Sequence, residues 1–253
     1  MAVLETILER LHDIRAIDTH EHLWDESYRL EHPGDWTLLF YHYGITALQM
    51  AGMSAAETDE LYADATPHAR KWEIFSRYYP AARNTGYLRA ARIAIRDLYG
   101  IEEVTSDSME ELTVRIREAV QPGFHHWVLT ERAGIDCAWV NCFDRDANED
   151  RYPVRDWGDT ALLRPALYAN DLIHPSGYGL ISGATGLDTA TLGDWLGAID
   201  ACFARYAPQC AAVKISLAYS RPLAFDPAVP RARAEALYAQ HRAEPLDNAA
   251  ARP

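Results

Sequence analysis

The segment AIDTHEH, residues 16–22, decides how the rest of the chain is interpreted. Successive side chains of a β-strand point to opposite faces, so His20 and His22 are expected to share one face. The opposite face is expected to take Ile17, Thr19 and Glu21. Two imidazoles on one rigid strand are a preformed pair of metal ligands, because their neutral nitrogens bind zinc at about 2.0–2.1 Å. The spacing alone is equally typical of two surface histidines at a strand end.

The residues around the pair favour the metal site. An apolar lead-in, formed by Ile14, Ala16 and Ile17, precedes the two histidines, and Asp18 stands two residues before the first of them. This pattern places the pair at the carboxyl end of a buried strand. Barrels of alternating strands and helices build their active sites at that end of their strands.

The segment DTHEH, residues 18–22, resembles the His-x-His signature in strand one of the amidohydrolase superfamily. Members of that superfamily are metal-dependent (β/α)8 barrels. The flanking residues 14–24 are most similar to the amidohydrolase-related (type 2) branch, which also holds uronate isomerases and some decarboxylases. The resemblance implies a divalent metal ion, Zn²⁺ or alternatively Mn²⁺, held by His20, His22 and ligands from elsewhere.

Length and charge limit the class of protein. A chain of 253 residues can bury one sizeable core, and about 250 residues is typical of a complete barrel. The 37 acidic and 24 basic side chains leave a formal net charge of −13. This balance argues against nucleic acid or an anionic membrane as a partner, because both require a basic surface. We expect a small-molecule substrate, and a homo-oligomer is compatible with the composition.

Cysteine usage and hydropathy indicate a cytoplasmic protein. The four cysteines form no C-x-x-C pair and are expected to be reduced thiols: Cys137, Cys142, Cys202 and Cys210. No stretch has the charged start and apolar run of a signal peptide, and none is apolar over the length of a membrane span.

Strand and helix patterns alternate in the N-terminal residues 2–22 and again after residue 134. Apolar spacing predicts helices over residues 2–15, 189–206 and 231–242, the first of them packed against the barrel ahead of strand one. Strands two, three and four are predicted over residues 134–143, 162–173 and 210–218. Alternating strands and helices indicate a parallel sheet with right-handed crossovers. The predicted fold is therefore α/β, of the metal-dependent (β/α)8 TIM-barrel type, in one domain over residues 1–253.

The sequence pattern predicts helices over the whole of about residues 37–132. Ser54 and Glu57 form a capping-box pattern, and Thr85 can cap a helix over residues 87–99 that ends at Gly100. A further helix is expected over 108–120. Because a crossover between parallel strands needs only a dozen or so residues, this segment is interpreted as a helical insertion after strand one. Uronate-isomerase-like members carry such an insertion, which is a second point of resemblance.

Lys214 is the candidate catalytic residue of strand four. By alternation Ala212, Lys214 and Ser216 share one face, and Val213, Ile215 and Leu217 share the face packed by helices. A lysine that points into a barrel is costly unless it is paired or modified. In binuclear amidohydrolases a strand-four lysine is carboxylated and bridges two metal ions, and Lys214 occupies a similar place. An acidic neighbour or direct contact with the substrate are the alternatives.

Four other residues are candidates for substrate binding. Arg83 and Asn84, inside the helical insertion, have the groups to hold a substrate carboxylate over the barrel mouth. The favoured alternative is structural, with Arg83 solvated and Asn84 at a helix start. Tyr219 and Arg221 follow strand four on the loop side, where each fits substrate contact or loop structure.

Together these features predict an enzyme. The main hypothesis is hydrolysis of a small polar substrate by a metal-activated water. The alternative on the same metal barrel is isomerisation of a uronate-like sugar acid, or decarboxylation. A barrel without catalysis that serves as a binding module is the alternative of another class.

The strand count predicts an incomplete barrel. The chain shows four strand patterns, whereas a closed barrel needs eight. The histidines of strands five and six and the aspartate of strand eight, which the resemblance implies as further ligands, have no counterpart after Lys214. We therefore expect the N-terminal half of a longer barrel, with weak metal binding and little turnover by itself. A natural short protein with an open sheet or a barrel built by two chains is the alternative.

Overall fold

The computed structural model describes most of the chain: residues 2–12, 14–23, 26–141, 161–173 and 177–243. It divides into two compact units. The first, called the sheet unit below, combines Met1–Leu23 with Gly134–Pro253, and the second, the helical unit, is Trp24–Ala133. No helix among the described residues is both long enough and apolar enough to cross a membrane.

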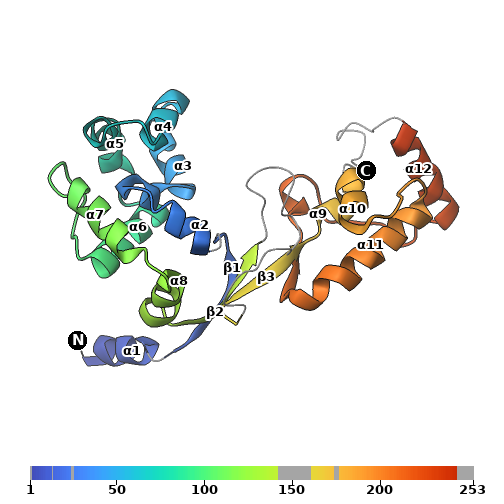
Figure 1. Cartoon of the computed structure of the whole chain (residues 1–253), viewed down its shortest axis with the longest axis horizontal. Helices are drawn as coiled ribbons and strands as arrows, with labels where there is room; N and C mark the ends of the chain where they lie inside the picture. The colour runs from blue at the N-terminus through green and yellow to red at the C-terminus, as the bar shows by residue number, and fades with distance from the viewer. Residues whose placement is uncertain (1, 13, 24–25, 142–160, 174–176, 244–253) are drawn as a thin grey trace. The chain divides into compact units, whose positions relative to one another are not determined.

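Four parallel strands form the centre of the sheet unit: β1 (Ala16–Glu21), β2 (Ile135–Asn141), β3 (Leu163–Tyr168) and β4 (Ala212–Lys214). They pair in the order β1-β2-β3-β4, so each strand lies beside the next one along the chain. Figure 1 labels the first three of them. Parallel strands in chain order, connected through helices, make one half of a (β/α)8 barrel. The predicted fold class, with strands one to four, is confirmed.

Strand β1 contains an irregularity beside the histidine pair. Asp18 pairs with Ala138 and Glu21 pairs with Val140, so three steps along β1 match two steps along β2. Paired residues of neighbouring strands point to the same face, so the two acidic side chains share a face that strict alternation would deny them. The extra residue lies between Asp18 and Glu21, so the phase of the side chains shifts at Thr19 and His20.

The third and fourth strands are shorter than expected. Strand β3 ends at Tyr168, and a short helix α9 (Asn170–Ile173) takes the remaining residues of the predicted strand. Strand β4 ends at Lys214 and is followed by the turn η5 (Leu217–Tyr219). The side chain of Asn170 accepts the backbone N–H of Ser216 at 2.7 Å, which replaces a ladder hydrogen bond where the strands stop.

The outer side of β4 is less covered than the sequence predicts. Leu217 is buried, as expected of a side chain packed by helices, but Val213 and Ile215 are exposed. Their expected burial is wrong, because no described helix lies over this short strand closely enough to remove both side chains from solvent.

Helices α10 (Tyr178–Thr185), α11 (Leu192–Tyr206) and α12 (Arg231–Ala243) complete the sheet unit. Thr191 caps α11 through a capping box with Asp194. The buried side of α11 packs with β3 and α10 into one apolar cluster: Leu167, Ala169, Leu172, Ile181, Trp195, Ala198, Cys202 and Tyr206.

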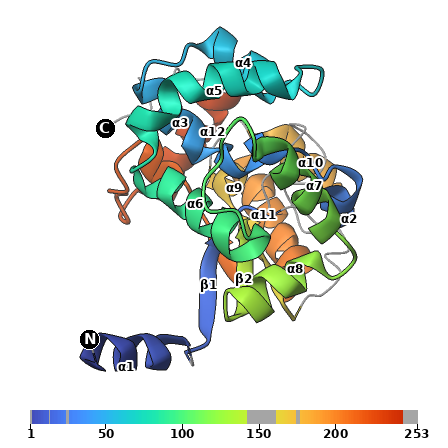
Figure 2. The same ribbon diagram turned by 90° about the vertical axis from the view of Figure 1, so that its left-hand side faces the viewer.

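Helix α1 (Ala2–His12) forms where the sequence predicts a helix, but it does not pack as expected. It extends from the start of β1 in both Figure 1 and Figure 2. Leu4, Ile7 and Leu11, the apolar side chains expected to face the barrel, are exposed. Nothing in the described part of the chain covers this face.

The helical unit carries the insertion after strand one (Figure 2): α2 (Glu26–Glu31), η1 (Trp36–Phe40), α3 (Tyr43–Met50), α4 (Ala55–Tyr62), α5 (His68–Ala82), α6 (Gly86–Tyr99), α7 (Met109–Ala119), α8 (Phe124–His126) and η2 (Trp127–Arg132). Ser54 and Glu57 form the predicted capping box of α4. Thr85 occupies the N-cap of α6 without a side-chain cap hydrogen bond, and Gly100 ends that helix in a left-handed conformation.

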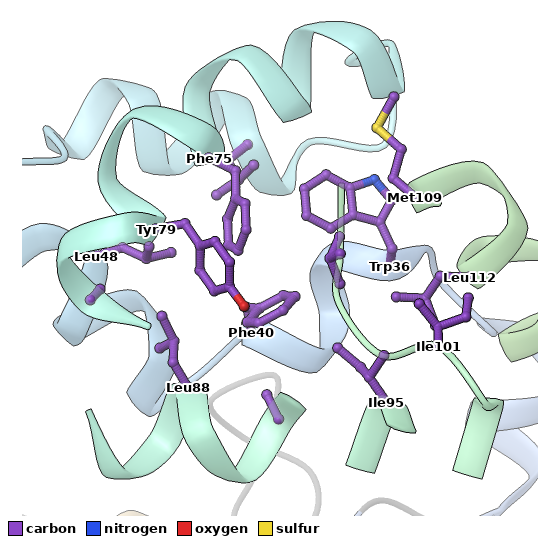
Figure 3. Packing of buried hydrophobic residues seen from close by; sticks show 14 of the residues in the cluster. Trp36, Phe40, Leu48, Phe75, Tyr79, Leu88, Ile95, Ile101, Met109 and Leu112 are labelled. Atoms are coloured by element: carbon purple, nitrogen blue, oxygen red, sulfur yellow. The ribbon is translucent and has the colours of Figure 1, made fainter. Parts of the chain in front are cut away.

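An aromatic cluster organises the core of the helical unit (Figure 3). Phe75 of α5 lies between three rings, with its centroid 5.1 Å from Trp36, 4.7 Å from Phe40 and 4.6 Å from Tyr79. Aliphatic side chains of α3, α6 and α7 close the cluster around them: Leu48, Leu88, Ile95 and Leu112. The helical unit therefore has a hydrophobic core of its own.

Candidate metal centre

His20 and His22 meet at the carboxyl end of β1. Their Nε2 atoms lie 3.0 Å apart, and the ring centroids are 4.9 Å apart with the planes inclined at 57°. Two nitrogens that bind one ion at about 2.0–2.1 Å each lie about 2.9–3.4 Å from one another. The pair therefore fits two neighbouring ligand positions of a single divalent ion.

Lys214 reaches this pair from β4, the strand at the opposite edge of the sheet. Its Nζ lies 3.2 Å from Nδ1 of His20. Because β1 and β4 are three strand spacings apart, about 14 Å in a flat sheet, these two side chains would not touch without curvature. The contact requires the sheet to bend toward the face that carries both groups, as the wall of a barrel does. We call this the inner face.

Register identifies the other members of the inner face. Tyr168 pairs with Lys214, and Ala166, two residues earlier in β3, pairs with Asn141 of β2. Ile17 pairs with Cys137, four residues before Asn141, and so belongs to the same face. Its expected place opposite the histidines is wrong, because the irregularity in β1 changes the phase of the strand between the two positions.

The hydrogen-bond chemistry of Lys214, His20 and His22 indicates where their protons lie. The ammonium group of Lys214 can only donate, so Nδ1 of His20 accepts. With Nδ1 as the acceptor, a neutral His20 ring carries its proton on Nε2, which can then donate to Nε2 of His22. A metal ion on the two Nε2 atoms requires both to be unprotonated, so the His20 proton has a different place when an ion is held.

Two carboxyl groups support the backbone of the histidines. Oδ1 of Asp18 accepts the backbone N–H of His20 at 3.0 Å, and Oε2 of Glu21 accepts that of His22 at 3.2 Å. Burial, together with a hydrogen bond to Asp18 and the charge of that residue, raises the pKa of Glu21 to about 7. Near neutral pH the Glu21 carboxyl is therefore protonated for part of the time.

The described residues complete no larger set of metal ligands. They contain no group of three or more His, Cys, Asp or Glu side chains placed to hold an ion together. Zinc sites in proteins use three or four protein ligands. The histidine pair fits such an ion in chemistry and distance and could supply two of its ligands.

A hydrogen-bonded polar group beside Lys214 was not singled out from the sequence. The hydroxyls of Tyr168 and Ser216 lie 2.7 Å apart, and Nδ2 of Asn170 lies 2.8 Å from the first and 2.5 Å from the second. All three follow or end strands β3 and β4. Their signal in the sequence is position alone, because polar residues directly after barrel strands belong to the active-site face.

Asn141 was also missed. It is the last residue of β2 and only 6% exposed, and its amide nitrogen has no hydrogen-bond partner among the residues that the structure describes. In the sequence it is a polar residue at the end of an otherwise apolar strand.

The predicted substrate-binding residues of the sheet unit lie after η5. Tyr219 is 87% exposed. The guanidinium of Arg221 lies 4.7 Å from the ring centroid of Phe225 and donates to the carbonyl of Pro222 at 3.3 Å. These contacts are local, and the substrate-binding role of both residues stays a prediction.

Arg83 and Asn84 belong to the helical unit, directly after α5. Nη2 of Arg83 lies 3.7 Å from Oε2 of Glu103, an ion pair within that unit. A carboxylate partner of this kind fits the structural interpretation, and a role of the two residues in substrate binding stays a prediction.

Solved structures share this fold. The uronate isomerase of Thermotoga maritima matches with a TM-score of 0.68 at 17% identity, over 93% of this chain and 53% of that one. The glucuronate isomerase of Caulobacter crescentus matches with a TM-score of 0.67 at 16% identity, over 93% and 52%. The chain thus spans about half the length of these enzymes. The sequence matches no protein-family model and no curated protein.

Proposed function

We propose that this chain is part of a metal-dependent aldose–ketose isomerase that acts on a uronate-like sugar acid. The observation that carries the proposal is the pair of imidazole nitrogens of His20 and His22, 3.0 Å apart at the carboxyl end of a barrel strand. The fold shared with two uronate isomerases supports the choice among metal-dependent reactions. Their identity to this chain is low, so the reaction itself is our proposal.

The inner face offers the groups that such a substrate needs. A divalent ion held by His20 and His22 supplies polarisation of the substrate carbonyl when bound. The ammonium of Lys214, next to His20, offers a positive charge to a carboxylate or to an oxygen that becomes negative. The hydroxyls of Tyr168 and Ser216 offer neutral hydrogen bonds to sugar hydroxyls.

Hydrolysis stays the second candidate because of one contact. The Nζ atom of Lys214 lies 3.2 Å from Nδ1 of His20, so a carboxylated lysine here would lie near the proposed metal ligands, as in the binuclear hydrolases. In that case the substrate would be an amide or a lactone, attacked by water.

Substrate profiling of the metal-loaded chain distinguishes these candidates. We expect isothermal titration calorimetry to detect binding of D-glucuronate by the chain after loading with Zn²⁺ or Mn²⁺, and no binding by the His20→Ala/His22→Ala variant. Conversion of the aldose to a ketose, followed by NMR, would support isomerisation directly.

Other outcomes contradict the proposal. Turnover of amides or lactones without binding of uronates would favour the hydrolase. Retention of metal with no binding or turnover of any of the three substrate classes would favour a binding module.

A further inference from the structure

Asn141 is buried in a way that packing does not explain. The residue is 6% exposed, and no group in the described part of the chain pairs with its amide nitrogen. Buried amides are nearly always paired, because an unpaired one has lost its water without compensation. Asn170, on the same side of the sheet, shows the ordinary case: its amide nitrogen contacts two hydroxyls and its oxygen accepts a backbone N–H.

Register places Asn141 beside the histidine pair. Glu21 of β1 pairs with Val140 of β2, so the next residues along the two strands are His22 and Asn141. Neighbouring strands lie about 4.8 Å apart. On its other side Asn141 pairs with Ala166, two residues before Tyr168.

Asn141 also points to the same side of the sheet as Lys214. Ala166, its partner in β3, is two residues from Tyr168, and Tyr168 pairs with Lys214. Alternation therefore puts all four side chains on the inner face, which carries His20. An unpaired donor lies at the same end of the sheet as the two imidazoles and the ammonium group.

We infer that Asn141 is a specificity-determining residue, whose amide nitrogen donates to a hydroxyl or carbonyl oxygen of the substrate bound beside His20 and His22. The inference rests on the proposed function and adds the residue that reads the substrate. The ligand class is a polyhydroxylated acid, because the neighbouring groups are a cation and neutral hydroxyls. A site built to bond a substrate hydroxyl rejects analogues that lack it, since its own polar group then stays unpaired.

Paired leucine substitutions test the inference. Asn141→Leu replaces an unpaired amide by an apolar group of similar volume, so the melting temperature without ligand should be unchanged or higher. Asn170→Leu is the matched control and should lower it, because that amide is fully bonded. With Zn²⁺ and D-glucuronate, N141L should bind at least about tenfold more weakly than the unmodified chain by calorimetry. Its zinc content should stay the same.

The outcomes separate this inference from the proposed function. If the unmodified chain binds D-glucuronate and N141L binds it equally well, Asn141 reads no substrate and the inference is overturned. If the unmodified chain binds no uronate, the proposed function fails. The melting temperature of N141L without ligand then decides whether the inference about Asn141 stands. A loss in N141L similar to that in N170L then overturns the inference, whereas no loss supports it. Should N141L not fold, Asn141→Ala removes the same amide and gives the same two readouts.

Discussion

At the scale of single residues, the helical unit contains a charge that its core almost completely encloses. Lys71 is 2% exposed, and its Nζ donates to Oδ2 of Asp35 at 2.6 Å. The other oxygen of Asp35 accepts the backbone N–H of Thr37 at 2.8 Å. His68 lies 3.6 Å from the same carboxylate. A buried pair of this kind is stable only while both partners are present.

Removing the lysine should therefore be costly. We expect Lys71→Met to lower the free energy of unfolding by about 3–5 kcal/mol, because the largely buried Asp35 carboxylate loses its cation. Urea denaturation followed by circular dichroism measures the loss. Arg77→Met, which removes a surface cation paired with Glu57 and Glu73, is the control and should cost much less. Equal losses in the two variants would show that burial of the pair is unimportant.

The same carboxylate makes stability depend on pH. Burial raises the pKa of Asp35, but the hydrogen bonds from Lys71 and Thr37 outweigh it, and the pKa lies below its ordinary value. A group with a lowered pKa stabilises the fold above its unfolded pKa and loses that contribution as the pH falls through the folded one. Below about pH 4 we expect the free energy of unfolding of the unmodified chain to fall more steeply with pH than that of the Asp35→Asn variant. Urea denaturation of both proteins at several pH values measures the two slopes.

The histidine pair gives a residue-scale prediction about metal binding. Because the two Nε2 atoms face one another, loss of either ring removes a ligand. We expect His20→Ala and His22→Ala each to weaken zinc binding by more than about 10–100-fold, the loss known for groups that only support ligands. His126→Ala, an exposed histidine of the helical unit, is the control. Undiminished zinc in the double variant, measured by elemental analysis, would contradict the metal site.

At the scale of elements, helix α6 carries a glycine at each end with opposite requirements. Gly100 ends the helix at a φ of 65°, and a Cβ there would lie 3.0 Å from Nη1 of Arg115, which donates to the carbonyl of Tyr99. Gly86 begins the helix, has no positive φ and has nothing within 4 Å of an added Cβ. The two positions form a matched pair within one element.

We expect alanine to act in opposite directions at these positions. Gly100→Ala should destabilise the chain by about 1–2 kcal/mol, because the left-handed conformation strains a residue with a Cβ. Gly86→Ala should be neutral or stabilise by up to about 1 kcal/mol, since alanine reduces the freedom of the unfolded chain and favours the helix. Thermal unfolding by circular dichroism tests both. Similar effects of the two changes would mean that the helix end is not held as the structure shows.

At the scale of the whole molecule, each unit has its own hydrophobic core. Phe75 is central to the core of the helical unit, and Leu167 of β3 belongs to the core of the sheet unit. Both side chains are fully buried. The chain therefore has two separate clusters whose loss can be followed separately.

We expect calorimetric unfolding to show two transitions. Phe75→Ala should lower the free energy of unfolding of the helical unit by about 3–5 kcal/mol. Leu167→Ala should lower that of the sheet unit by about 2–5 kcal/mol. Both losses come from lost burial and the cavities left behind. A single transition that both variants shift equally would contradict two independent cores.

Local pattern was enough for much of this protein. The alternation of strands and helices identified four parallel barrel strands and the helical insertion between the first two. Alternation within a strand placed Lys214 on the side where it meets His20. The Ser54 capping box and the helix end at Gly100 were also predicted from the sequence and are present in the structure. Each of these depends on residues a few positions apart, and the sequence alone contains that information.

The tertiary structure alone decided what depends on contacts between distant residues. The irregularity in β1, which moves Ile17 to the inner face, follows from pairing with β2 more than a hundred residues away. The end of β3 at Tyr168 follows from the bonds of Asn170 to Ser216. Asn141 became a candidate only when its amide proved to be buried without a partner among the described residues. Burial and pairing are properties of strand register and sheet curvature, which no periodicity within one strand encodes.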